Sequence, residues 1–290
     1  KTRSIEDYEI LRKLEPGYLA EIGCEERIFG ESFLARDIRT HTLVTIQKAR
    51  HMRHMDSCQF ESDLQALFDC PFLVHCNEVL ANEKELWVWF GEEVTNQVVM
   101  EYSVCGSVDS YLLNGNNFTE DEIREIAVAA FWDWSTCIIT ISLMGQFIVS
   151  GFDRIEHQAG ELLLFENGVV KLCHCGLPEE LEAYSFGRGR QRGGSRYDPP
   201  EALDGKRERK SDVWSLGVSL IEMADGKNPF ECYADYEVKS AIRSVNPSLS
   251  GEKWSAAFVV FVRKCLVKDV SERRNVSELM NVSVVMGSDD

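Results

Sequence analysis

Residues Lys210 to Phe230 read Lys-Ser-Asp-Val-Trp-Ser-Leu-Gly-Val-Ser-Leu-Ile-Glu-Met-Ala-Asp-Gly-Lys-Asn-Pro-Phe. Apolar or small residues occupy nearly every side of this run when it is drawn as a helix, with Ser211 as its predicted cap and Asp225-Gly226 as its end. A helix that is apolar on all sides is a buried one. The stretch therefore predicts a buried helix over residues 211–225, with the acid Asp212 near its N-terminal end.

The composition limits the classes of function. The 290 residues include 48 acidic and 31 basic side chains, a formal net charge of −17, which argues against general binding to nucleic acid or to anionic membranes. No apolar run is long enough to span a membrane. Ten cysteines are scattered without a disulfide framework, as is typical of reduced thiols in an intracellular protein, and no metal site is predicted. We expect a cytoplasmic location, with or without a nuclear share.

The order of residues in the opening stretch and near it matches a known pattern. Asp212-Val-Trp-Ser-Leu-Gly-Val, followed by Glu222-Met-Ala-Asp-Gly-Lys-Asn-Pro-Phe, resembles the central helix of the protein-kinase C-lobe in the sterile-twenty group. Tyr197-Asp-Pro-Pro-Glu201 resembles the motif that closes a kinase activation segment. The resemblance implies that Asp212 ties down the catalytic loop and that Glu201 forms a structural ion pair with Arg273.

The resemblance covers nearly the whole chain and implies an α+β, two-lobed kinase-like fold. The N-lobe, residues 1–101, is expected to hold a five-stranded sheet and one helix. The larger, mainly helical C-lobe, residues 102–290, is expected to be built around the helix 211–225.

The phosphate-binding positions of a kinase carry different residues here. The glycine-rich loop reads Gly23-Cys-Glu-Glu-Arg-Ile-Phe-Gly30, and its two glutamates would repel a triphosphate. Val44-Thr-Ile-Gln47 matches the pattern Val-Ala-Ile-Lys, so a neutral Gln47 replaces the lysine that holds the phosphates. Lys48 is the alternative, although a shift by one residue points it to the opposite face of the strand.

The segment between the lobes is expected at Met100-Glu101-Tyr102, with Met100 preferred over Phe90 as the gatekeeper. Glu61 falls where the kinase helix has the glutamate that pairs with the missing lysine. The resemblance assigns the following residues to the nucleotide pocket: Ile22, Gly23, Gly30, Gln47, Met100, Glu101 and Tyr102.

The catalytic loop and the metal-binding motif are also altered. Counted back from Leu162, Glu156 stands for the catalytic Asp and Glu161 for the Asn that binds Mg²⁺. Counted forward from Gly145, the Asp position falls instead on Ser150, and Asp153 is a further acid in reach. His174 replaces the Mg²⁺-binding Asp, and imidazole is a poor ligand for this hard cation.

Four changed positions at one chemical centre, beside a preserved C-lobe frame, favour a pseudokinase that is not an enzyme. The lengthened glycine loop and the non-lysine Gln47 resemble the STE-related adaptor (STRAD) pseudokinases. That resemblance implies an allosteric adaptor that activates a serine/threonine kinase similar to liver kinase B, together with an armadillo-like scaffold protein. The helix around Glu61 and the activation segment would be the contact faces, and ATP would bind without Mg²⁺. The alternative is a weak or unconventional serine/threonine kinase that uses Lys48 and either Glu156 or Asp153.

Overall fold

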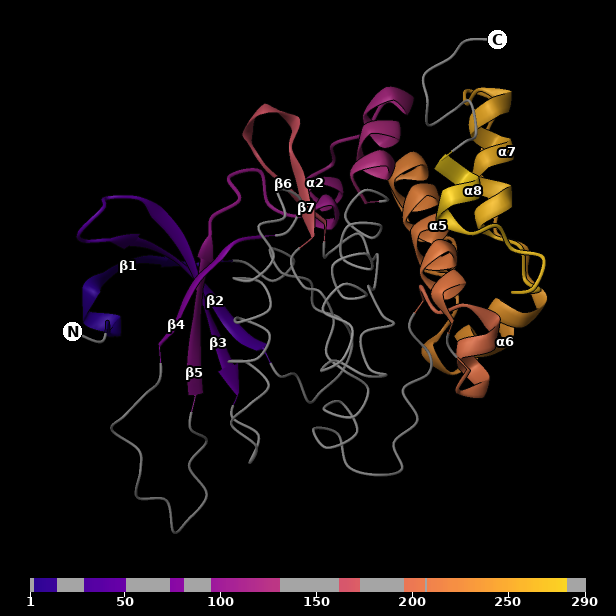
Figure 1. Ribbon diagram of the computed structural model, residues 1–290. Coiled ribbons are helices and arrows are strands. Elements are labelled where there is room, and N and C mark those ends of the chain that lie inside the picture. The colour runs from indigo at the N-terminus through magenta and orange to yellow at the C-terminus, as the bar shows by residue number, and fades with distance from the viewer. Residues whose placement is uncertain are drawn as a thin grey trace.

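The computed structural model describes residues 3–14, 29–50, 74–80, 95–130, 162–172, 196–206 and 208–280. In this part of the chain an antiparallel sheet is followed by a mainly helical unit (Figure 1). The α+β architecture predicted from the sequence is confirmed.

The sheet has five strands in the order β1-β2-β3-β5-β4. Their bounds are β1 Tyr8–Lys13, β2 Phe29–Asp37, β3 Leu43–Arg50, β4 Cys76–Leu80 and β5 Thr95–Glu101. A short 3-10 helix, η1 (Ile5–Asp7), precedes them. Arg3, just before η1, fixes this start to the sheet, because its guanidinium lies 2.9 Å from the carboxylate of Asp37 and 2.8 Å from that of Glu78.

The helical unit begins after β5 with α2 (Val108–Leu113) and a helix that covers residues 120–130. Thr119 and Glu122 cap this second helix reciprocally, since each backbone N–H donates to the side chain of the other residue. The remaining elements are β6 (Leu162–Leu164), η4 (Glu166–Gly168), β7 (Val170–Leu172), η5 (Pro200–Asp204), α5 (Arg209–Asp225), α6 (Asp235–Ser244), α7 (Ala256–Cys265) and α8 (Val276–Met280).

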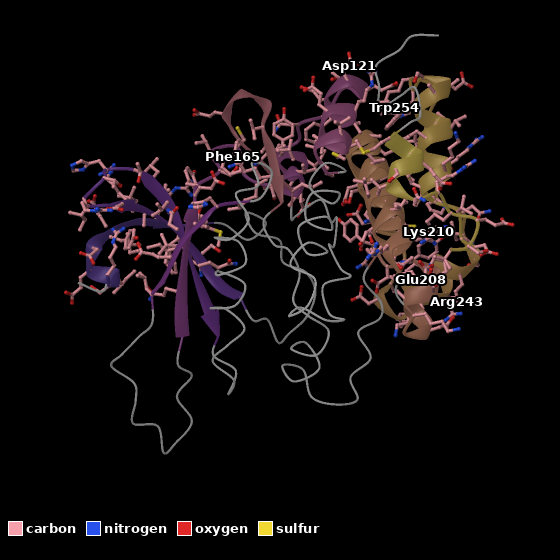
Figure 2. The ribbon with its side chains drawn as sticks, in the orientation of Figure 1. Asp121, Phe165, Glu208, Lys210, Arg243 and Trp254 are labelled. Carbon is pink, nitrogen blue, oxygen red and sulfur yellow. The ribbon has the colours of Figure 1, made fainter. Side chains whose placement is uncertain are left out.

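Helix α5 is the centre of the helical unit, as the sequence predicts. Every residue from 211 to 224 is buried, and Gly226 ends the helix in the left-handed conformation with φ of 73°. Gly217 lets α7 approach closely, because a Cβ there would lie 2.8 Å from the Cβ of Cys265. In Figure 2, Glu208 and Lys210 mark the N-terminal end of α5, and Trp254 lies near its opposite end.

The predicted start of α5 needs one correction. The N-cap is Glu208, and Ser211 occupies the third helical position, where its Oγ accepts a hydrogen bond from the Glu208 N–H at 3.0 Å. The helix begins at Arg209, because Glu208 is the residue that still has an extended backbone, with φ of −133°. Ser211 also donates to Glu201, at 2.9 Å. No helix among the described residues has both the length and the apolar composition needed to cross a membrane.

Candidate functional site

The two faces of the sheet have different compositions around β3. Residues opposite one another in neighbouring strands share a face. Val44 and Ile46 of β3 belong to a buried apolar cluster made with Tyr8, Ala35, Leu80 and Val99. The alternate residues Thr45 and Gln47 therefore point to the other face of the sheet.

The face with Thr45 and Gln47 also holds the predicted gatekeeper. Thr45 lies opposite Leu34 on β2 and Met100 on β5, and all three side chains are buried. Leu34 packs in turn against Tyr102, two residues beyond Met100. The structure thus brings Gln47, Met100 and Tyr102 of the predicted nucleotide site onto one face.

Gln47 is a buried polar side chain with an unsatisfied atom. Only 3% of the residue is exposed, and its Oε1 has no hydrogen-bond partner among the residues that the structure describes. Its neighbours across the sheet are Ser32 and Val98, neither of which is charged. A buried acceptor that lacks a donor costs about 1–3 kcal/mol, so this position favours a ligand or water that can donate.

The segment that leaves β5 is joined to the β6–β7 hairpin. Oε1 of Glu101 accepts from Nζ of Lys171 at 2.6 Å and from the N–H of His75 at 2.7 Å. The ammonium of Lys171 also lies 5.0 Å from the ring centroid of Phe165. These contacts hold the predicted hinge, Met100 to Tyr102, against the β6–β7 hairpin.

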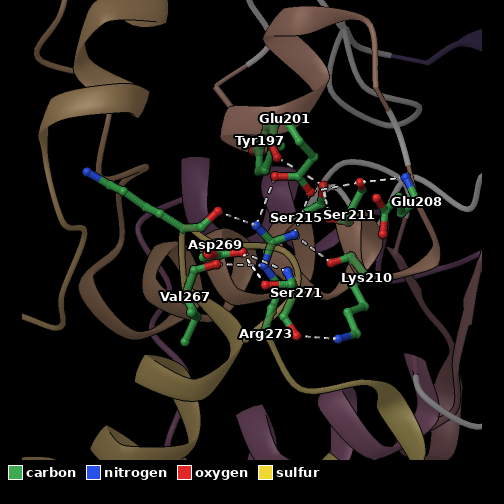
Figure 3. A network of polar contacts seen from close by, with 11 residues as sticks. Tyr197, Glu201, Glu208, Lys210, Ser211, Ser215, Val267, Asp269, Ser271 and Arg273 are labelled. Carbon is green, nitrogen blue, oxygen red and sulfur yellow. Dashed lines mark hydrogen bonds and ion pairs between the residues drawn. The ribbon is translucent and has the colours of Figure 1, made fainter.

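A buried ion pair organises the other end of the helical unit (Figure 3). The guanidinium of Arg273 donates to both carboxylate oxygens of Glu201, at 2.6 and 3.0 Å. It also donates to the carbonyls of Val267 and Lys210, each at 2.8 Å. The Arg273 side chain is fully buried. The pair expected from the sequence is therefore a bidentate clamp between η5 and the loop before α8.

A second set of polar contacts fixes Tyr197 on α5. Its hydroxyl donates to Glu222 at 2.6 Å, and its carbonyl accepts from Ser215 at 2.9 Å. Burial, together with the negative charges of Asp109 and Glu231, raises the pKa of Glu222 to about 7, although the bond from Tyr197 works against this rise. Burial and Glu222 in turn raise the pKa of Tyr197 well above its ordinary value. The motif Tyr197 to Glu201 is thus anchored to α5 at both ends.

Part of the predicted site lies outside the described residues. This applies to Ile22, Gly23, Glu61, Glu156, Glu161 and His174, and to the alternatives Phe90, Ser150 and Asp153. Gly30 lies in β2, Asp212 is buried in the first turn of α5, and the side chain of Lys48 is also outside the described part. The sequence did not predict the bond from Lys171 to Glu101 or the bond from Ser211 to Glu201. The three-residue spacing of Glu208 and Ser211 is the one signal that could have indicated the place of Ser211 in the helix.

The sequence of this chain is similar to those of known protein kinases. The family described as "Protein tyrosine and serine/threonine kinase" matches residues 155–282. The serine/threonine-protein kinase Tao of Drosophila melanogaster is 29% identical over 92% of this chain and 24% of its own length. The serine/threonine-protein kinase dst1 of Dictyostelium discoideum is 34% identical over 63% of this chain and 24% of its own length.

A third relative extends the comparison to dual-specificity enzymes. The human dual specificity mitogen-activated protein kinase kinase 7 is 27% identical over 98% of this chain and 71% of its own length. The chain thus spans only about a quarter of the length of the first two relatives. Because all three are named as kinases, the prediction that the chain is not an enzyme is wrong, and the comparisons point to a kinase.

Proposed function

We propose that this chain, which carries a protein-kinase domain with homologues in the sterile-twenty group, is a serine/threonine kinase that transfers phosphate from ATP slowly. The observation that supports this most is the clamp between Glu201 and Arg273. It fixes Glu201, the last residue of the stretch Tyr197 to Glu201, to the loop before α8 and to the carbonyl of Lys210 in α5. In the kinase fold this stretch closes the segment that presents the protein substrate. The clamp therefore supports a role for this stretch in presenting a protein substrate.

The contacts of the predicted hinge, Met100 to Tyr102, support the proposal that this chain binds ATP. Met100 lies on the same sheet face as Gln47, and Glu101 is tied to Lys171 of β7. These contacts fix the backbone from Met100 to Tyr102, and they support the proposal that this segment receives adenine. We propose that ATP binds here without requiring Mg²⁺, because His174 is a poor ligand for that cation.

The transfer is expected to be slow because Gln47 is neutral. In the kinase fold the lysine at this position holds the phosphates and positions the γ-phosphoryl group. A carboxamide supplies no charge to balance the negative charge of the phosphates. The substrate hydroxyl would lose its proton to a carboxylate of the predicted catalytic loop, and Glu156 and Asp153 are the two candidates.

A phosphotransfer assay tests the proposal. The purified chain is incubated with γ-labelled ATP and a mixture of protein substrates, with Mg²⁺ or Mn²⁺, and labelled residues are identified by mass spectrometry. We expect slow labelling of serine and threonine that is lost in Glu156→Gln or in Asp153→Asn. The variant Glu166→Gln, which changes an exposed acid on η4, should keep the wild-type rate.

Two outcomes would contradict the proposal. One is the absence of labelled product with either metal ion. The other is equal labelling by wild type and by all the acid variants, including the double variant of Glu156 and Asp153, since that would indicate a contaminating kinase.

Allosteric activation of a partner kinase stays a prediction, and so does the assistance of a helical-repeat scaffold protein. Such a role is compatible with catalysis by this chain. Its predicted contact faces, the helix around Glu61 and residues 178–194, lie outside the described residues. The cytoplasmic location is likewise an expectation from composition.

A further inference from the structure

A guanidinium group joins the two edge strands of the sheet. Strands β1 and β4 lie at opposite edges in the order β1-β2-β3-β5-β4. The guanidinium of Arg3 nevertheless lies 2.8 Å from the carboxylate of Glu78 on β4 and 2.9 Å from that of Asp37 at the end of β2. Its carbon also lies 4.6 Å from the ring centroid of Tyr8 on β1. Two carboxylates and an aromatic ring thus surround one cation.

The sheet itself holds these three groups in place. Oδ1 of Asp37 accepts from two backbone N–H groups of the β2–β3 turn, at 2.8 and 3.2 Å, and Oδ2 is the atom that faces Arg3. The hydroxyl of Tyr8 donates to the carboxylate of Glu78. Tyr8 and Asp37 lie opposite one another in the β1–β2 pair. Because none of these bonds involves Arg3, the site should keep its shape when Arg3 leaves.

The site requires a cation. The side chain of Asp37 is only 7% exposed. Burial by itself would raise the pKa of Asp37, but Arg3 and two backbone N–H groups lower it to about 2. Its carboxylate therefore stays charged at neutral pH, and a buried charge without a partner is costly. The side chains of Arg3 and Glu78 are 25% and 23% exposed, so a cation from solvent can reach the position that Arg3 occupies.

The geometry suits a guanidinium rather than an ammonium group. Nη2 of Arg3 lies beside Asp37, and Nη1 lies beside Glu78. A guanidinium carries five N–H donors in a planar fork, and its flat face can lie on an aromatic ring. An ammonium group is a compact point charge, so it cannot contact both carboxylates and the ring of Tyr8 in this way.

We propose that Asp37, Glu78 and Tyr8 form a binding site for an arginine side chain, which Arg3 fills in cis and which an arginine-bearing peptide fills when Arg3 withdraws. Tyr8 belongs to the buried cluster with Val44 and Ile46, so the site lies on the sheet face opposite to that of Gln47. Its ligand therefore binds away from the proposed nucleotide face, and the site does not depend on phosphate transfer.

Rescue by a small guanidinium compound tests the proposal. The melting temperature of the whole chain is measured for the wild type and for Arg3→Ala, with millimolar propylguanidinium chloride or the same concentration of propylammonium chloride. We expect Arg3→Ala to lose stability, and propylguanidinium to restore at least half of that loss while propylammonium restores less than a quarter. If Arg3→Ala does not fold alone, its yield on refolding with each of the two cations decides in the same way.

The control variant is Arg36→Ala on the same sheet. Arg36 lies 3.0 Å from Glu9, and the two side chains are 43% and 56% exposed, so neither cation should change the melting temperature of this variant. The absence of any loss in Arg3→Ala overturns the proposal. Equal recovery with both cations, or an equal response of Arg36→Ala, overturns it as well.

A peptide extends the test to the proposed class of ligand. A fluorescent peptide with the sequence of residues 1–7 is titrated with Arg3→Ala, and so is the same peptide with neutral citrulline in place of its arginine. We expect the arginine peptide to bind at least tenfold more tightly than the citrulline peptide, and the wild type to bind the arginine peptide at least tenfold more weakly than Arg3→Ala does. Equal binding of the two peptides by Arg3→Ala, or equal binding of the arginine peptide by the wild type and Arg3→Ala, overturns the proposal.

Discussion

Replacement of Arg273 by methionine should destabilise the helical unit strongly. Arg273→Met removes two charged hydrogen bonds to Glu201, at 2.6 and 3.0 Å, and leaves the carbonyls of Val267 and Lys210 without this donor. Glu201 would keep the hydrogen bond from Ser211. Removal of one partner from a buried ion pair costs about 3–5 kcal/mol, and we expect a loss of that size in the free energy of unfolding.

Urea unfolding at 25 °C, followed by tryptophan fluorescence, measures this loss. The ring centroid of Trp214 lies 5.3 Å from the guanidinium carbon of Arg273. The neighbouring variant Arg274→Met is the matched control. The guanidinium of Arg274 lies 3.4 Å from the carboxylate of Glu278, and both side chains are more than 40% exposed. Because an exposed ion pair contributes little to stability, the Arg274→Met variant should unfold at the same urea concentration as the wild type. The double variant with Glu201→Gln gives the coupling between the two residues. A loss below about 1 kcal/mol for Arg273→Met, or no coupling, would refute the view that this ion pair stabilises the helical unit.

Two further predictions concern α5. Because burial raises the pKa of Glu222 from its ordinary value of 4.5 to about 7, the folded chain holds this proton more tightly than the unfolded chain. The contribution of Glu222 to the free energy of unfolding is fully present below pH 4.5. It falls by about 3 kcal/mol as pH rises to about 7. Urea unfolding from pH 4.5 to 8 should show this fall in the wild type and not in Glu222→Gln, and a similar slope in both would contradict it. Gly217→Ala should lose about 1–3 kcal/mol, because the new Cβ would lie 2.8 Å from the Cβ of Cys265. A gain in stability, as expected of alanine in an exposed helix, would show that α7 shifts to make room.

The local features of the fold were predictable from the sequence. The apolar residues all round 211–225 require burial, and the structure buries every residue from 211 to 224. Asp225-Gly226 predicts the end of the helix, and Gly226 has the positive φ that such an end requires. The start was predicted less well, because a serine can cap a helix or occupy its third position. The structure has Glu208 as the cap and Ser211 at the third position, where it accepts from the Glu208 N–H.

Long-range contacts were predictable only where the family resemblance supplied them. The bond between Glu201 and Arg273 joins residues far apart in the chain, and nothing in their local sequence indicates it. The bond between Glu101 and Lys171, which the resemblance did not cover, was missed for this reason. The position of Gln47 on β3 followed from the strand pattern, but its unsatisfied oxygen depends on neighbours from other strands.

The prediction that the chain is not an enzyme failed for a different reason. By the family resemblance, Gln47, His174, Glu161 and either Glu156 or Ser150 stand where a kinase has its phosphate-binding, metal-binding and proton-accepting residues. Each such replacement would raise the barrier to phosphate transfer. Residue identity alone does not give the size of that increase, so it cannot distinguish slow transfer from none. The named kinases among the relatives correct the inference.

The rate of phosphate transfer by Gln47→Lys, compared with that of the wild type, tests the central claim most directly. If the chain is a kinase whose rate is limited by the neutral side chain at this position, the wild type labels serine and threonine slowly and the variant does so at least tenfold faster. A catalytically inert variant that nevertheless folds and binds ATP would contradict the claim that this chain is a kinase.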